Sequence, residues 1–145
     1  KSRGKVFESI LEIGSGCGYQ SAILSFFSEE VHAIERIKPL VQKSRENLSK
    51  LKINNVLVKH GDGYQDWEKE KKYDGIICAA APREYPNDLI SVLNNDSKLV
   101  IPVGGATQKL NMITKINQDE IKEEEFDDVS FVPMLAGKSE DGNDV

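Results

Sequence analysis

The sequence predicts an α/β domain with a mostly parallel, twisted β-sheet, helices on both faces of the sheet and an antiparallel C-terminal edge. Three observations predict this fold class. Short apolar runs alternate with helical patterns through most of the chain, which is typical of β-α-β units. A glycine-rich turn joins the first apolar run directly to a helical pattern. After Gly105 the helical patterns stop and two strand patterns follow one another, so we expect these last strands to be antiparallel neighbours.

The strands of the parallel part are expected where short apolar runs end at turn-forming residues. These runs are residues 6–13, 31–35, 56–60, 73–78 and 99–103. Pro102 must lie at a strand end or on a sheet edge, because proline has no N–H for a central ladder. Two later strands are expected over 108–116 and 128–135, and the acidic run 119–128 is expected to be a solvated hairpin region.

Helices are expected where apolar residues recur with helical spacing, over 19–27, 39–51 and 87–93. Pro39 suits a first helical turn, where the N–H that proline lacks would have no partner in any case. Residues 1–138 are expected to form one domain that is large enough for a real core. The polar tail 139–145 is expected to fray.

Composition and charge exclude several functional classes. The net charge is −5, no basic stripe is present, and no apolar run approaches the length of a membrane span, so we expect neither nucleic-acid nor membrane partners. The two cysteines, Cys17 and Cys78, lack metal-ligand spacing, which predicts no metal site, no disulfide framework and a reducing cytoplasm. No apolar segment follows the basic residues 1–5, so no signal peptide is expected. The oligomeric state stays open.

The turn after the first strand has the pattern Glu12-x-Gly14-x-Gly16-x-Gly18. Glycines let the backbone approach a ligand closely, and the N-terminus of the helix that follows supplies free N–H donors. A P-loop would need Lys-Ser/Thr after the last glycine, and a dinucleotide fold would need glycine at position 19, which is tyrosine. An acid at the start of the turn suits a ligand with an ammonium and a sulfonium group. The spacing resembles motif I of S-adenosylmethionine (SAM) methyltransferases; a NAD enzyme and a turn without a ligand are the less favoured alternatives.

Other polar residues come at the ends of later strands, where open parallel sheets bind ligands. Glu35 lies 21 residues after Gly14, the separation typical of an acid that binds a ribose. Asp62 stands between two glycines that would let it reach an adenine edge. The alternatives are an exposed strand-end acid for Glu35 and a turn former for Asp62. The small side chains of 79–82 (Ala-Ala-Ala-Pro) leave room beside a ligand.

Several segments together are very similar to bacterial-type protein-L-isoaspartate O-methyltransferases, over roughly Val6 to Gly137. They are Leu11-Glu-Ile-Gly-Ser-Gly-Cys-Gly-Tyr-Gln20, Ile34-Glu-Arg-Ile37, Asn55-Val56, His60-Gly-Asp-Gly63, Tyr73-Asp74, Ala79-Ala-Ala-Pro82, Ile101-Pro-Val-Gly104 and Phe131-Val-Pro133. The resemblance implies the Rossmann-like fold of class I SAM methyltransferases, with SAM as cofactor. It also implies a repair reaction, in which the free carboxylate of L-isoaspartyl residues in damaged proteins is methylated.

The resemblance implies roles for individual residues as well. The SAM-binding set would be Glu12, Gly14, Ser15, Gly16, Gly18, Glu35, Arg36, Asp62 and Gly63. The set beside the peptide groove would be Ala80, Pro82, Pro102, Val103 and Val132. The partners would be isoaspartyl-containing peptides and proteins.

The chain departs from the family in one respect. Family members carry a Gly-x-Thr-Ile-Ser motif before the first strand, whose hydroxyls bind the substrate carboxylate, and nothing in these 145 residues matches it. We therefore expect no catalytic side chain within the chain, and an incomplete catalytic core that binds SAM and transfers methyl groups poorly. The alternatives are a non-catalytic SAM-binding or interaction module, and a methyltransferase with another acceptor.

Overall fold

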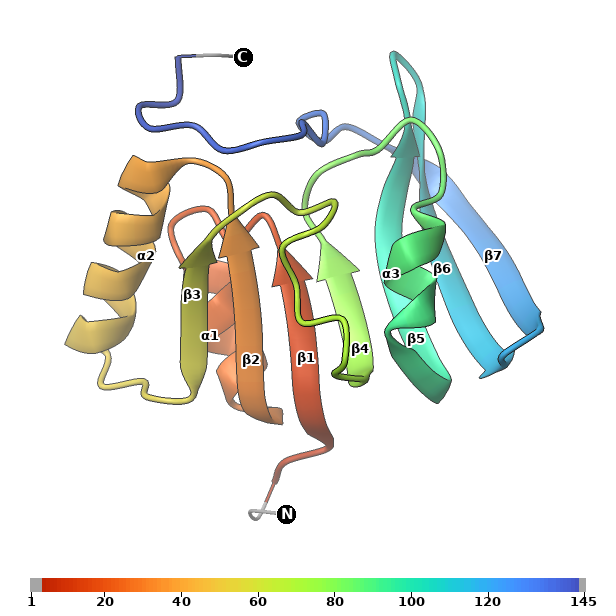
Figure 1. Ribbon diagram of the computed structural model, residues 1–145, viewed down its shortest axis with the longest axis horizontal. Helices are drawn as coiled ribbons and strands as arrows, with labels where there is room; N and C mark the ends of the chain where they lie inside the picture. The colour runs from red at the N-terminus through yellow and green to blue at the C-terminus, as the bar shows by residue number, and fades with distance from the viewer. Residues whose placement is uncertain (1–3, 144–145) are drawn as a thin grey trace.

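A computed structural model describes residues 4–143 and contains one sheet of seven strands in the order β3-β2-β1-β4-β5-β6-β7 (Figure 1). The strands are β1 (Phe7–Ile13), β2 (Ser28–Glu35), β3 (Val56–His60), β4 (Tyr73–Cys78), β5 (Leu93–Gly104), β6 (Gln108–Asn117) and β7 (Glu120–Val129). The first five strands pair in parallel, and β6 and β7 pair antiparallel. The predicted fold class is therefore confirmed.

The helices are α1 (Tyr19–Ser25), α2 (Lys38–Lys50) and α3 (Asn87–Ser91). Figure 1 shows α1 behind the sheet and α3 in front of β5, so helices lie on both faces. Apolar residues of α1 and α2 pack on β2 and β3 in one cluster that includes Ala22, Val41 and Leu48. A second and larger cluster, which includes Tyr73 and Leu99, lies under α3 and the loop that joins β3 to β4.

Strands β3 and β4 have the predicted bounds, whereas β2 and β5 begin earlier than predicted. The early part of β5 contains Asn94, Asn95 and Asp96, whose composition is typical of a turn. Asp96 has a φ of 63°, and the register with β4 shifts at this point, so the strand carries an irregularity before it resumes at Lys98. A bulge tolerates polar residues, so a search for apolar runs does not detect the beginning of this strand.

The predicted strand over 128–135 is wrong. The acidic segment expected to be a solvated hairpin region is itself the strand β7, and the antiparallel pairing of the last two strands is confirmed. β7 is an edge strand whose residues are nearly all exposed, so it has no apolar face and no alternation to detect. Charged side chains on an edge strand also discourage pairing with another molecule.

The segment 130–143 crosses above the carboxyl ends of the parallel strands (Figure 1). The tail was expected to fray from Ser139, but Ser139 is 3% exposed and forms an isolated bridge with Ile37, the N-cap residue of α2. Its N–H donates to the Arg36 carbonyl over 2.7 Å, and its carbonyl accepts from the Lys38 N–H over 2.9 Å. The last two residues of the predicted tail, 144–145, lie outside the described residues. No helix within residues 4–143 combines the length and the apolar character that crossing a bilayer requires.

Candidate functional site

The glycine turn between β1 and α1 forms one wall of the candidate site. Gly14, Gly16 and Gly18 all have positive φ, at 84°, 56° and 92°. At Gly18 a Cβ would lie 3.2 Å from the Ser44 Cα, so α2 packs directly on the turn. At Gly16 a Cβ would meet nothing within 4 Å, so the turn has an open side. The sequence therefore builds a turn that is packed at its end and accessible at its centre.

Glu12 lies beneath this turn, at the end of β1, with no exposed surface. The Ser21 hydroxyl of α1 donates to Glu12 Oε1, while Oε2 has no hydrogen-bond partner. Burial raises the pKa of Glu12 from 4.5 to about 7, and the hydrogen bond from Ser21 and the nearby Gln20 side chain oppose this rise only in part. The buried Ser15 hydroxyl in the turn also lacks a partner. Buried polar atoms without partners are rare in folded proteins, and these two belong to the glycine turn and to the strand end before it.

Glu35, at the end of β2, joins the turn to the neighbouring strand end. Its Oε1 accepts from the Gly16 N–H over 2.9 Å, and its Oε2 accepts from the Ile37 N–H over 3.0 Å. The residue is 6% exposed. Each carboxylate oxygen has a second acceptor position, so the same group can hold the turn and still accept hydrogen bonds from a ribose. The following residue, Arg36, contributes its backbone carbonyl to Ser139.

Asp62 is 4% exposed, and its carboxylate accepts hydrogen bonds from backbone and side-chain donors of the protein. Its Oδ1 accepts from the Tyr64 N–H over 2.8 Å, as in a turn former. Its Oδ2 accepts from the Gln65 side chain over 3.2 Å and from the Gly137 N–H over 2.9 Å. At Gly63 a Cβ would lie 2.5 Å from Ile13 Cγ2, so glycine is required there by packing. The turn-forming alternative thus describes the contacts of Asp62, and its contact with adenine stays a prediction.

The five residues predicted to lie beside the peptide groove do not lie together in the structure. A groove of about 1070 Å³ opens at the carboxyl ends of β4 and β5, and Pro82 is among its lining residues. Pro102 is fully buried in the β5–β6 ladder, opposite Leu110. Ala80 is also buried, Val103 is half-buried, and neither lines the groove. Val132 is 68% exposed and reaches this region through its carbonyl, which accepts from the Ala81 N–H over 2.8 Å.

Sequence reasoning missed the residues that shape this groove. They include Tyr64, Arg83, Tyr85, Gln108, Phe131 and Met134. Gln108 holds Phe131 by two hydrogen bonds of 2.8 and 3.0 Å to its backbone, and the Tyr64 hydroxyl donates to the Met134 carbonyl over 2.8 Å. These contacts join segments that are far apart in the chain, and a local pattern carries no signal for them. The contacts of His60 could not be predicted for the same reason: its Nε2 lies 2.9 Å from the Arg36 carbonyl and 3.1 Å from the Ser139 carbonyl.

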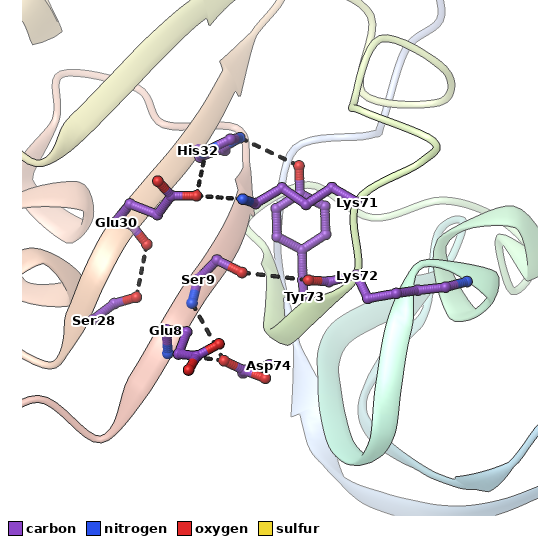
Figure 2. Close-up of polar contacts among 9 residues, drawn as sticks. All are labelled: Glu8, Ser9, Ser28, Glu30, His32, Lys71, Lys72, Tyr73 and Asp74. Carbon is purple, nitrogen blue, oxygen red and sulfur yellow. Dashed lines mark hydrogen bonds and ion pairs between the residues drawn. The ribbon is translucent and has the colours of Figure 1, made fainter. Parts of the chain in front are cut away.

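A second polar cluster lies away from the carboxyl ends of the strands, near the start of β4 (Figure 2). Glu30 accepts from Lys71 and from His32 Nε2, the latter over 3.1 Å. With its proton on Nε2, His32 can accept at Nδ1 from the Tyr73 hydroxyl, 3.3 Å away. Burial raises the pKa of Tyr73 to about 12, so this hydroxyl remains a donor at neutral pH. The cluster fixes the loop before β4 onto β2 and contributes no group to the site above.

A glycine turn after β1, a buried acid beneath it and a second acid at the end of β2 define the class of Rossmann-like SAM methyltransferase domains. A solved Plasmodium falciparum structure, described as a protein-L-isoaspartate O-methyltransferase in complex with S-adenosyl-L-homocysteine, superposes with a TM-score of 0.73 at 32% identity over 88% of this chain and 66% of that one. Another solved protein-L-isoaspartate O-methyltransferase has a TM-score of 0.83 over 94% of this chain and 44% of its own, and at 21% identity it supports the fold alone.

The chain belongs to the protein-L-isoaspartate(D-aspartate) O-methyltransferase (PCMT) family, whose sequence model matches residues 5–139. A protein-L-isoaspartate O-methyltransferase from Azoarcus sp. is 43% identical over 137 residues, which are 94% of this chain and 63% of that protein. One from Aliivibrio fischeri is 43% identical over 130 residues, which are 90% of this chain and 62% of that protein. The chain therefore spans a little over three fifths of these relatives.

Proposed function

We propose that this chain is the cofactor-binding part of a SAM-dependent methyltransferase that repairs damaged proteins. Its acceptor would be the free carboxylate of an L-isoaspartyl residue. The observation that carries the proposal is the buried Glu12 carboxylate, with one oxygen unpartnered, beneath a glycine turn that is held by Glu35. Family membership and the Plasmodium relative in complex with S-adenosyl-L-homocysteine support it. Cys17 and Cys78 are free thiols, which supports a cytoplasmic setting.

The residues present fit this cofactor. A ligand with an ammonium and a sulfonium would compensate the charge of Glu12 and favour its ionised form, which burial otherwise disfavours. Ser15 would supply a hydroxyl to a polar group at the turn, and Glu35 would accept from the ribose hydroxyls. The cofactor, when bound, supplies an electrophilic methyl group: the new C–O bond forms as the C–S bond breaks, and the electron pair stays on sulfur.

The acceptor needs little chemical activation by the protein. An α-carboxyl-like group has a pKa of about 3.3 to 3.7, so it is already ionised at neutral pH. The main task of the site is therefore to align the carboxylate with the methyl group and to exclude water. The groove beside Pro82 has Arg83, Glu84 and Tyr85 in its lining, and Arg83 is the cationic side chain there that can pair with the carboxylate of the acceptor.

Titration calorimetry with SAM and with S-adenosyl-L-homocysteine tests the cofactor half of the proposal. We expect one site for each ligand, and binding at least about tenfold weaker in Glu35→Gln, because the loss of one carboxylate acceptor affects both the turn and the ribose. Glu46→Gln, at an exposed position on α2, is the matched control and should bind as the unchanged chain does. Absence of binding by folded protein would refute the cofactor assignment.

Methyl transfer to a peptide with one isoaspartyl residue, compared with the same peptide carrying normal aspartate, tests the acceptor. We expect selective but slow transfer by these 145 residues, which contain no Gly-x-Thr-Ile-Ser motif. Equal transfer to both peptides would indicate another acceptor. Cofactor binding without transfer by the chain, either alone or extended at its N-terminus to the length of its relatives, would favour a non-catalytic SAM-binding module.

A further inference from the structure

A second groove, of about 1100 Å³, lies at the end of the sheet opposite to the end that carries the glycine turn. It is formed by the end of α3, the beginning of β5 and the turn between β6 and β7, which lie together at the bottom of Figure 1. Its lining includes Lys72, Ser91, Asn95, Lys115 and Gln118. None of these residues has a part in the site described above.

Two lysines converge on one oxygen at this groove. Lys72 Nζ donates to the Ser91 carbonyl over 2.5 Å, and Lys115 Nζ lies 3.4 Å from the same oxygen and 3.0 Å from the Leu93 carbonyl. Figure 2 shows Lys72 pointing away from Glu30 and toward α3, whereas its neighbour Lys71 points to Glu30. Lys115 is only 8% exposed, so its side chain is packed into the wall of the groove.

Within residues 4–143, the acceptors of the two ammonium groups are neutral carbonyl oxygens. Across the part of the chain that the structure describes, no carboxylate forms an ion pair with Lys72 or Lys115. Asp119 lines the groove from the β6–β7 turn without pairing with either lysine. Burial and the nearby charge of Lys72 lower the pKa of Lys115. Like charges held together in a partly buried place are costly, and carbonyl dipoles at the end of α3 offset that cost only in part.

We propose that this groove binds a phosphate group between Lys72 and Lys115. A phosphate monoester carries about −1.5 to −2 charges at pH 7, which matches two adjacent ammonium groups better than a single carboxylate does. Lys115 uses two of its three N–H donors on carbonyls and Lys72 uses one, so both retain donors for phosphate oxygens. The exposed Asn95 and Gln118 side chains can add amide donors at the rim.

Amide chemical shifts measured by NMR during titration with inorganic phosphate, at constant low ionic strength, test this proposal. We expect the shifts to concentrate at residues 91–95 and 115–119. Lys72→Met should bind phosphate about tenfold more weakly, because one charge-assisted interaction is lost. Lys50→Met, at an exposed position on α2, is the matched control and should bind as the unchanged protein does. Equal affinity of the two variants, or no localised shifts, would overturn the proposal.

The titration of Lys115 itself gives a second readout that a merely structural lysine would not show. The pKa of its amine, followed through the side-chain ε-methylene signals, should rise when phosphate is present, and an unchanged value would contradict the proposal. Ribose 5-phosphate, titrated in parallel, distinguishes the source of the phosphate. Tighter binding of the ester than of inorganic phosphate indicates a phosphorylated small molecule, and equal binding indicates free phosphate.

Discussion

Glu12 shows how one buried side chain couples the site to pH. Because its pKa is raised to about 7, the folded protein without ligand holds a proton that the unfolded chain releases near pH 4.5. The unfolding free energy should therefore decrease as pH rises from about 4.5 through 7, by up to about 3 kcal/mol from this group. In Glu12→Gln this contribution should disappear.

Urea unfolding of the unchanged protein and of Glu12→Gln at several pH values between 5 and 8 measures this effect. The difference in unfolding free energy should move in favour of Glu12→Gln as pH rises and level off above pH 7. The exposed Glu46→Gln should parallel the unchanged protein. A difference that stays constant over this range would show that Glu12 does not titrate as described.

Gly63 gives a prediction about packing. Gly63→Ala places a Cβ 2.5 Å from Ile13 Cγ2 and 3.1 Å from Met134 Cε, so the core must shift. We expect a loss of about 1–3 kcal/mol in unfolding free energy, measured by denaturant unfolding. At Gly105 a Cβ would meet nothing within 4 Å, so Gly105→Ala is the control and should change stability far less. Similar losses in both variants would show that the contacts with Ile13 and Met134 are not the cause, because the entropy of the unfolded chain by itself favours alanine at both positions.

The residues of the site differ in how far the sequence could predict them. Glu35 could be placed by counting, because strand, helix and strand lengths in a β-α-β unit fix the separation from the glycine turn. The role of Asp62 could not be settled, because its partner Gly137 is 75 residues away. The unpartnered oxygen of Glu12 was also beyond prediction, since it depends on how α1 packs over β1.

At the scale of elements, the C-terminal segment 130–143 depends on a few hydrogen bonds to the strand ends. Asp62→Asn replaces one acceptor oxygen by an NH₂ group that faces the Gly137 N–H and the Gln65 side chain. We expect a loss of about 1–3 kcal/mol, concentrated in this segment. Amide hydrogen exchange at Met134, Gly137 and Ser139 should accelerate more than exchange in β1.

Asp88→Asn, at an exposed position on α3, serves as the control for that experiment. Uniform acceleration throughout the sheet would show that Asp62 stabilises the whole domain and not the segment.

The elements themselves were predictable where burial imposes a pattern. β3 and β4 are short apolar runs, and their bounds were predicted correctly. β7 has no buried face, so nothing in its composition separates it from a solvated turn. The crossing segment 130–143 has no regular secondary structure beyond two isolated bridges, from Pro133 to Ala81 and from Ser139 to Ile37, so tertiary contacts alone define its path.

At the scale of the whole molecule, one sheet extends through the domain. Ligand binding at the glycine turn should therefore stabilise the entire domain. S-adenosyl-L-homocysteine at about one hundred times its dissociation constant should add about 2.7 kcal/mol to the unfolding free energy. For a domain of this size the melting temperature should rise by roughly 5 to 10 °C.

The measurement is thermal unfolding over a series of ligand concentrations, compared with the dissociation constant from calorimetry. Glu35→Gln should need a higher concentration for the same rise, in proportion to its weaker binding, while Glu46→Gln should follow the unchanged protein. An equal rise in Glu35→Gln would mean that the ligand stabilises the protein from somewhere other than the edge that Glu35 and Gly16 build.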